Sequence, residues 1–260
     1  MVLWDNSFTE TKHTEKEMPK LLSTANPKIQ KGTARGYLSF ILHLAPADES
    51  GYEVCPKRTA GCTSGCLNKA GHGGMFKKGE TTNHVQKARI RRTKHFFENR
   101  NAFMLDLADD ITRAYTKARK HNLTPVIRLN GTSDLSWEKY LVPGFDCNLF
   151  ELFHYIQFYD YTKVLGRKVK HIPNYHLTFS RAEDNEADCA EARRQGMNVA
   201  TVYDTIPDGV YSAENDDLRF LDPVVGTIGL KAKGPAKKDY SGFVIRINQV
   251  AWQLNQVGLQ

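Results

Sequence analysis

Three cysteines lie within twelve residues of this chain, and no other feature constrains the fold more. Cys55, Cys62 and Cys66 have C-x6-C-x3-C spacing and are separated by glycines and small polar residues. Such a segment has few apolar side chains with which to build a core, so we expect a loop that is held from outside. Clustered thiolates suit a soft metal centre, either an iron–sulfur cluster or zinc with His72 as fourth ligand. A disulfide plus a spare thiol is the alternative.

Length and composition indicate an ordinary globular protein. The chain has 260 residues, of which 40% are hydrophobic and 25% charged. We expect an irregular, lysine-rich arm over residues 1–34 and one α/β domain over residues 35–260. No apolar run is long enough to span a membrane, and the first residues lack a signal peptide, so we expect a cytoplasmic protein with reduced thiols. The net charge of +7 favours polyanions but also serves solubility.

The apolar pattern predicts alternating strands and helices. Residues 36–45 form a short aromatic and aliphatic run, which predicts a buried strand before the cysteine loop. Apolar residues recur at helical spacing over residues 84–121, with a break near residues 99–101. Further strands are expected at residues 125–130, 156–163, 175–180, 198–204 and 224–233, with helices at 137–140, 148–153 and 184–196. This order is typical of parallel β-structure with crossover helices, and we expect an open or partial α/β barrel.

Polar residues follow the predicted strands at their carboxyl ends. In a parallel barrel these ends meet at one mouth, where active sites lie. We expect catalytic roles for Asp134 and Lys163 there, and we expect the polar side chains gathered at this mouth to be solvated when the site is empty. The residues expected to bind a cofactor or ligand at the same mouth are Asn130, Ser133, Ser180 and Lys231. Lysines and arginines among the strand ends favour a carboxylate, a phosphate or a nucleotide as the ligand.

Other groups offer alternative sites. The carboxylates of Asp134, Asp160 and Asp204 suit a divalent cation, although their spacing in the sequence matches no metal-binding motif. The basic run over residues 87–94 is compatible with nucleic-acid binding or with an ordinary solvent-facing helix. Cys147 is either a further ligand or a reactive thiol, whereas Cys189 in a predicted helix suits a buried apolar role. The chain has no P-loop, G-x-S-x-G, H-E-x-x-H or Rossmann motif.

Several motifs together resemble a known family. The cysteine loop after the first strand, Arg128-Leu-Asn-Gly-Thr-Ser-Asp134, Tyr161-Thr-Lys163 and Gly229-Leu-Lys-Ala-Lys-Gly234 are similar to the phage gene-product-88 family, whose members are uncharacterised. More distantly, the layout resembles radical S-adenosylmethionine (SAM) enzymes. That resemblance implies a partial barrel in which Cys55, Cys62 and Cys66 hold a [4Fe-4S] cluster, with SAM bound to the open iron through its amino and carboxylate groups. The cysteine spacing departs from the C-x3-C-x2-C pattern typical of those enzymes.

Two functional hypotheses follow. The first is an iron–sulfur enzyme of radical SAM type acting at a basic pocket, on a small molecule, a nucleotide or a nucleic acid. The second is a noncatalytic phage protein, stabilised by zinc or a cluster, that binds nucleic acid or a host protein in the host cell cytoplasm.

Overall fold

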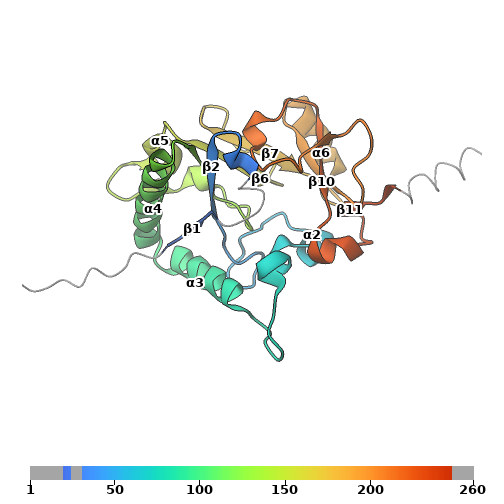
Figure 1. Cartoon of the computed structure of the whole chain (residues 1–260), viewed down its shortest axis with the longest axis horizontal. Coiled ribbons are helices and arrows are strands. Elements are labelled where there is room, and N and C mark those ends of the chain that lie inside the picture. Colours follow the sequence, from blue (N-terminus) through green and yellow to red (C-terminus); the bar gives the residue numbers. More distant parts are fainter. Residues whose placement is uncertain (1–19, 25–30, 248–260) are drawn as a thin grey trace, which may run out of the picture.

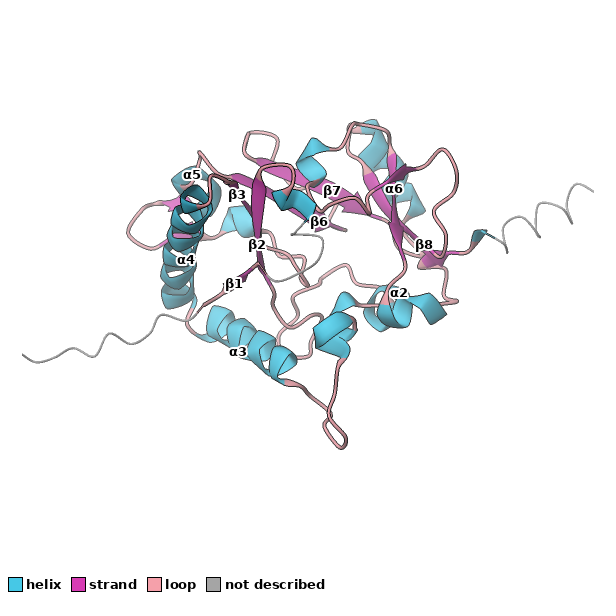
Figure 2. Ribbon diagram, in the orientation of Figure 1, coloured by secondary structure: helices cyan, strands magenta, loops and turns pink. Residues whose placement is uncertain are grey.

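A mostly parallel sheet of nine strands organises the molecule (Figures 1 and 2). The computed structural model describes residues 20–24 and 31–247. The strands follow the order β1-β2-β3-β6-β7-β8-β10-β9, and β11 also pairs with β8. Their bounds are β1 Leu22–Ser23, β2 Tyr37–Leu42, β3 Thr124–Arg128, β6 Gln157–Thr162, β7 Tyr175–Ser180, β8 Val199–Tyr203, β9 Tyr211–Ser212, β10 Thr227–Lys231 and β11 Val244–Ile245. Strands β4 (Leu141–Val142) and β5 (Cys147–Asn148) form a separate antiparallel pair.

The sheet is parallel because crossover segments connect successive strands. β2, β3, β6, β7, β8 and β10 are neighbours in sequence order and run in the same direction. Only β1, paired with β2, is antiparallel within this sheet. The expected parallel α/β architecture is therefore confirmed. Among the described strands no pairing joins β1 to β9, so the sheet is open and no closed barrel is present.

Five α-helices between the strands have both ends within the described residues, and residues 31–33 are also helical. The five are α2 Ala60–Ser64, α3 His84–Glu98, α4 Arg100–Lys120, α5 Leu149–Leu152 and α6 Glu186–Arg194. Short 3₁₀ turns cover η1 Leu67–Lys69, η2 Gly71–Gly74, η3 Trp137–Lys139, η4 Arg219–Leu221 and η5 Gly234–Lys238. The expected break in the long helical region lies at Asn99, which ends α3 and precedes α4. No described helix has the length and apolar character needed to cross a membrane.

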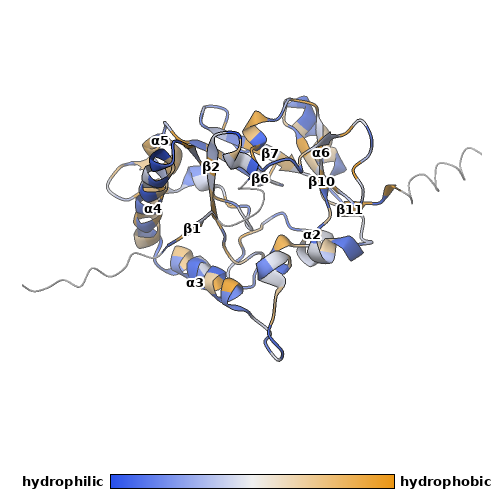
Figure 3. Ribbon diagram, in the orientation of Figure 1, coloured by the Kyte–Doolittle hydropathy of each residue, from blue (hydrophilic) through white to orange (hydrophobic). Residues whose placement is uncertain are grey.

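The largest core lies between α4 and the first strands. Phe103, Leu107 and Ile111 of α4 are fully buried with Phe40 and Ile127 of the sheet. Burying each such side chain contributes about 1.5–3 kcal/mol to stability. Figure 3 shows polar and apolar residues alternating around α3 and α4, as expected of helices with one face on a core. In Figure 1, α4 and α5 lie at one end of the sheet and α6 at the other, with α2 and α3 below the strands.

Two expectations about local structure are wrong. Residues 1–34 are not irregular throughout, because β1 pairs with β2 and the N–H groups of Leu21 and Leu22 both donate to the Asp110 carboxylate. The remainder of that arm, apart from residues 20–24 and 31–34, lies outside the described residues. Helix α6 follows Asn185 instead of Asp184, and the Asn185 side chain accepts a hydrogen bond from the Ala182 N–H.

Candidate functional site: the cysteine segment

The cysteine segment, residues 55–74, is more regular than a loop. Thr59 caps α2, with its hydroxyl accepting the N–H of Cys62 at 3.1 Å. Cys66 then begins the 3₁₀ turn η1, and the glycine-rich residues around His72 form η2. The segment therefore places Cys62 within a helical turn and Cys66 at the start of the next. The expected loop is therefore broken into three short helical turns, two of which have a side-chain cap at their start.

Contacts with the far end of the sheet hold the segment. Glu183, which follows β7, accepts the Thr59 hydroxyl at 2.7 Å and the Gly61 N–H at 2.6 Å. Gly61 lies so close to its neighbours that an added Cβ would lie 2.7 Å from the Cβ of Phe243. A Cβ added at Gly65 would lie 3.2 Å from the Cβ of Ala236. Residues that follow β7 and β10, together with Phe243 beside β11, thus clamp the segment.

The first cysteine lies at the end of β3. The Cys55 Sγ is 3.8 Å from the Thr132 carbonyl oxygen, and the Asp134 N–H donates to the Val54 carbonyl at 2.8 Å. Together with the Glu183 contacts, this places the cysteine segment across the carboxyl ends of strands from both halves of the sheet. The cysteine segment therefore contacts residues that follow β3 and β7.

The three thiols share one electrostatic environment. Cys55, Cys62 and Cys66 are half-buried and free, and each lies within electrostatic reach of the other two. Burial raises the pKa of the Cys55 thiol to about 12 and raises the pKa of Cys66. Backbone N–H groups of Ala47 and Asn68 donate to the sulfurs of Cys55 and Cys66, both at 3.5 Å. Such bonds stabilise a thiolate.

A buried cation supports this environment. Arg89 of α3 donates to the Asn68 side-chain oxygen, and the Asn68 amide donates to Glu49 at 2.8 Å. Burial lowers the pKa of Arg89, while the neighbouring Cys66 and Glu49 raise it. Arg89 therefore places positive charge beside the thiols from the inner side of α3.

Cysteine thiolates are common ligands of soft metals, but the arrangement of the described residues shows no metal site. Among the described residues, no three His, Cys, Asp or Glu side chains are grouped closely enough to hold one metal ion. His72 is exposed. No described group of carboxylates supports the alternative cation site of Asp134, Asp160 and Asp204.

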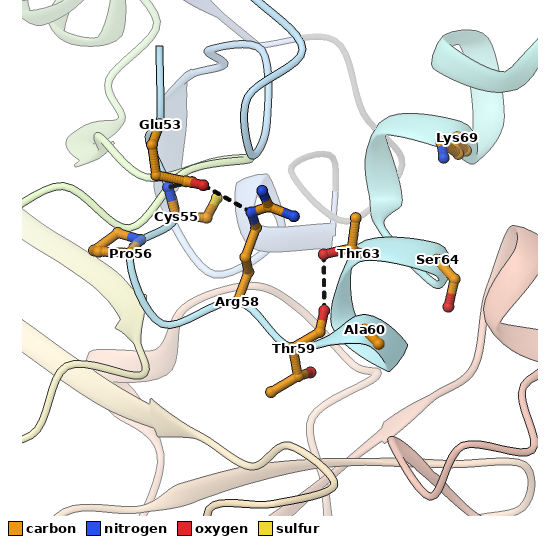
Figure 4. A pocket seen from close by; sticks show the side chains of 9 residues that line it. All are labelled: Glu53, Cys55, Pro56, Arg58, Thr59, Ala60, Thr63, Ser64 and Lys69. Carbon is orange, nitrogen blue, oxygen red and sulfur yellow. Dashed lines mark hydrogen bonds and ion pairs between the residues drawn. The ribbon is translucent and has the colours of Figure 1, made fainter. Parts of the chain in front are cut away.

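A pocket of about 710 Å³ opens beside Cys55 (Figure 4). Charged and hydroxyl side chains line it, and the Arg58 Nε donates to Glu53 at 2.8 Å. Lys69 lies across the pocket on η1. The pocket thus presents a thiol, a carboxylate and two cations to one space.

The strand-end residues expected at the mouth line neither of the two described pockets. Asn130 is only 2% exposed. Its side-chain oxygen accepts hydrogen bonds from the Ser133 hydroxyl, the Leu135 N–H and the Trp137 indole N–H. Its backbone N–H donates to Asp160 at 2.6 Å. The expectation of a solvated Asn130 is therefore wrong, because its amide links β3, β6 and the Trp137 turn.

Asp134 and Lys163 lie side by side at the ends of β3 and β6. The Asp134 carboxylate accepts the Lys163 backbone N–H at 2.7 Å, and its side chain is 12% exposed. Burial raises the pKa of Asp134, so the expectation of a solvated carboxylate is wrong here too. The Lys163 ammonium instead lies 5.9 Å from the ring centre of Phe243, which packs against Gly61 of the cysteine segment.

Ser180 and Lys231 lie at the strand ends of the other half of the sheet. The Ser180 carbonyl accepts the Asn185 side-chain amide at 3.0 Å, which anchors the start of α6. Lys231 is exposed, and its backbone N–H donates to Glu214. Of the other two cysteines, Cys189 is buried in α6 as expected, and Cys147 lies in the β4–β5 pair.

The basic run on α3 divides between two sides of the helix. Arg89 is buried and Arg92 is half-buried, donating to the carbonyls of His43 and Lys20, whereas Lys87, Arg91 and Lys94 are exposed. Sequence reasoning missed the supporting roles of Arg89, Asn68 and Glu183. The helical periodicity of α3 could have indicated that Arg89 is buried, because Arg89 lies on the same face of the helix as the buried residues at positions 86, 93 and 96.

Comparison with known proteins gives a family and no function. A family model described as Gene product 88 matches residues 13–247. No curated protein matches the chain, and no solved structure does.

Proposed function

Because the chain belongs to the gene product 88 family of phage proteins, whose members offer no activity to transfer, we propose from the cysteine segment that it is an iron–sulfur protein. In this proposal Cys55, Cys62 and Cys66 hold a [4Fe-4S] cluster. The observation that carries it is the gathering of three free thiols in one segment clamped over the strand ends. Backbone N–H groups and a buried arginine beside the sulfurs are the features that stabilise thiolates.

Zinc is the less suitable metal for this arrangement. A tetrahedral zinc with Zn–S bonds of about 2.3 Å needs its sulfurs about 3.8 Å apart, together with a fourth ligand. Among the described residues no group of three or more His, Cys, Asp or Glu side chains could hold a metal ion, so a zinc site would require the thiols to move. In a cluster each thiolate binds a different iron, so the sulfurs lie further apart and three of them suffice.

We further propose a radical SAM-like role for this centre. Three protein ligands leave one iron free to bind an exogenous group. The pocket beside Cys55 offers Arg58 and Lys69 to a carboxylate and Glu53 to an ammonium, the two groups through which SAM would bind. Asp134, within electrostatic reach of Cys55, and Lys163, beside Phe243, are the proposed catalytic groups.

Anaerobic reconstitution with iron and sulfide tests the cluster. The wild-type protein should become brown, absorb near about 400 nm and bind about four irons per chain. Serine at Cys55, Cys62 or Cys66 should abolish incorporation, whereas Cys147→Ser and Cys189→Ala should leave the iron content unchanged. A colourless protein with one zinc per chain, or equal iron in all five variants, contradicts the proposal.

Calorimetric titration of SAM into reconstituted protein tests the ligand separately. Arg58→Ala and Glu53→Gln should each weaken binding by about tenfold, because each removes one charged partner of SAM. Lys57→Ala, one residue away and exposed outside the pocket, is the matched control and should bind as wild type. Equal affinities in all variants would exclude this pocket as the SAM site without affecting the cluster.

A further inference from the structure

The positive charge of this chain is concentrated in one segment. Residues 55–95 contain ten lysines and arginines and a single acidic residue, Glu80, so their net charge is +9. The whole chain carries +7, which means that the remaining residues are slightly acidic. Because this asymmetry is local, solubility alone does not account for it.

Much of this charge is exposed and unneutralised. Six of the cations are exposed and form no ion pair with any residue in the described part of the chain: Lys69, Lys77, Lys78, Lys87, Arg91 and Lys94. We call these six residues the basic face. Elsewhere, buried arginines such as Arg167 and Arg219 are paired with carboxylates. Carboxylates thus pair with these two buried arginines, while the basic face remains available to an external polyanion.

A pocket with both polar and apolar lining residues, Glu49 among them, accompanies these charges. It measures about 500 Å³ and is lined by Lys69, Phe76, Gln86 and Ile90 among others. Lys87 and Arg91 directly follow Gln86 and Ile90 on α3, and Lys94 lies one turn beyond Ile90. At a rise of about 1.5 Å per residue, Lys87 and Lys94 are about 10 Å apart along the helix. Phe76 at this pocket is 45% exposed, so its ring is accessible to a ligand.

We propose that the basic face binds single-stranded nucleic acid, with phosphates along Lys87, Arg91 and Lys94 and a base against Phe76. A groove of cations beside an exposed aromatic ring is the usual design for single strands, because an unpaired base can stack on the ring. A duplex cannot offer such a base without being opened. The inference goes beyond the proposed cluster and does not depend on it, since neither the charges nor Phe76 involve a thiol.

Fluorescence anisotropy with a labelled oligothymidylate of about 15 nucleotides tests the charges. Affinity should fall with salt, and replacing Lys87, Arg91 and Lys94 together by glutamine should weaken binding at least about tenfold. The slope of log affinity against log salt should fall by about two, at about 0.7 per phosphate contact. Glutamine at Lys117, Arg119 and Lys120, exposed at the end of α4, removes the same charge and should change affinity less than about twofold.

A second pair of variants tests the base contact. Phe76→Ala should weaken binding about tenfold without changing the salt slope, because stacking contributes no counterion release. Phe145→Ala, a ring that is 55% exposed in the β4–β5 turn, is its control and should bind as wild type. Protein before and after iron–sulfide reconstitution should bind the oligonucleotide equally well, which separates this proposal from the cluster.

Three outcomes would overturn the proposal. If the two triple variants weaken oligonucleotide binding equally, the oligonucleotide is attracted by the net charge of the protein and not by the basic face. An unlabelled duplex that competes as well as the single strand would exclude the base contact. Binding to vesicles with about one third phosphatidylserine but not to the oligonucleotide would assign the basic face to a membrane surface.

Discussion

Two parts of the same sheet edge use polar residues in opposite ways. At the ends of β3 and β6, Asn130 and Asp160 are buried and bonded to each other and to neighbouring groups, including the Tyr175 hydroxyl at 3.0 Å. In the cysteine segment and the start of α3, thiols and cations border pockets, and many cations have no described partner. In the first region the polar groups bond to one another, whereas in the second region thiols and cations remain available to a ligand.

The difference shows how a strand-end polar residue should be interpreted. A polar group whose hydrogen bonds are made within the protein adds rigidity, and its loss lowers the stability of the fold. The loss of a polar group that borders a pocket lowers the affinity for a ligand instead. Four predictions separate these effects: three substitutions, from the largest expected loss of stability to the smallest, and then one pH dependence.

Asn130→Ala should lower the free energy of unfolding by about 3 kcal/mol, because it leaves the Trp137 indole N–H and the Leu135 N–H buried without an acceptor. Urea denaturation monitored by Trp fluorescence measures this. Lys231→Ala, at an exposed strand end, should change stability by less than about 0.5 kcal/mol. Equal stability of the two variants would remove the distinction between the closed and open regions.

Gly61→Ala should loosen the cysteine segment at a cost of about 2 kcal/mol. The new methyl group would lie 2.7 Å from the Phe243 Cβ and 2.9 Å from a Glu183 oxygen, so the clamp must shift. Hydrogen exchange should then rise over residues 59–66 more than in the sheet. Ala60→Ser adds one atom at an exposed neighbouring position and should leave exchange unchanged. Unchanged exchange in Gly61→Ala would mean that this contact does not hold the segment.

Asp134→Ala should lower the free energy of unfolding by about 1 kcal/mol. It removes the acceptor of the Lys163 N–H, but it also removes a carboxylate whose pKa is raised by burial, which offsets part of the loss. Lys163→Ala retains that backbone bond and should change stability by less than about 0.5 kcal/mol. Thermal melts of both variants measure the difference. A larger loss for Lys163→Ala would show that its side chain, instead of the backbone bond, joins the two strand ends.

Asp160 should make stability depend on pH. Burial raises its pKa from 3.8 to about 7, so the native state keeps a proton that the unfolded chain releases near pH 4. Its contribution to the unfolding free energy should therefore fall as pH rises from about 4 to 7, by at most about 1.4 kcal/mol per pH unit. Denaturation curves of Asp160→Asn should lack this part of the slope. Parallel profiles for wild type and Asp160→Asn would assign the slope to other groups.

The regular elements could be predicted because their signals are local. The run from Tyr175 to Ser180 forms β7 with the same bounds, and the polar break at Asn99 separates α3 from α4. β1 could not be predicted, since its two residues form a strand only through β2 and the Asp110 carboxylate of α4. Pairing with distant partners overrides local composition in such short strands.

The site could be predicted only in part, for the same physical reason. The spacing of Cys55, Cys62 and Cys66 is visible in the sequence, as is their place beyond β2. The fate of Asn130 is not, because polar residues at a strand end look alike whether they face solvent or a buried indole. Glu183 is 122 residues from Gly61, and no local pattern indicates that its carboxylate caps the cysteine segment.

The clamp on the cysteine segment also sets an order of events during synthesis. Gly61 and Phe243 are 182 residues apart in the chain yet pack against each other. At about 5–20 residues per second, a ribosome makes Phe243 about 10–40 s after Gly61. Throughout that interval Cys55, Cys62 and Cys66 lack the β10–β11 side of their enclosure. The thiols therefore become enclosed only after Phe243 has been made, and until then they are accessible to the cell's metal and redox chemistry.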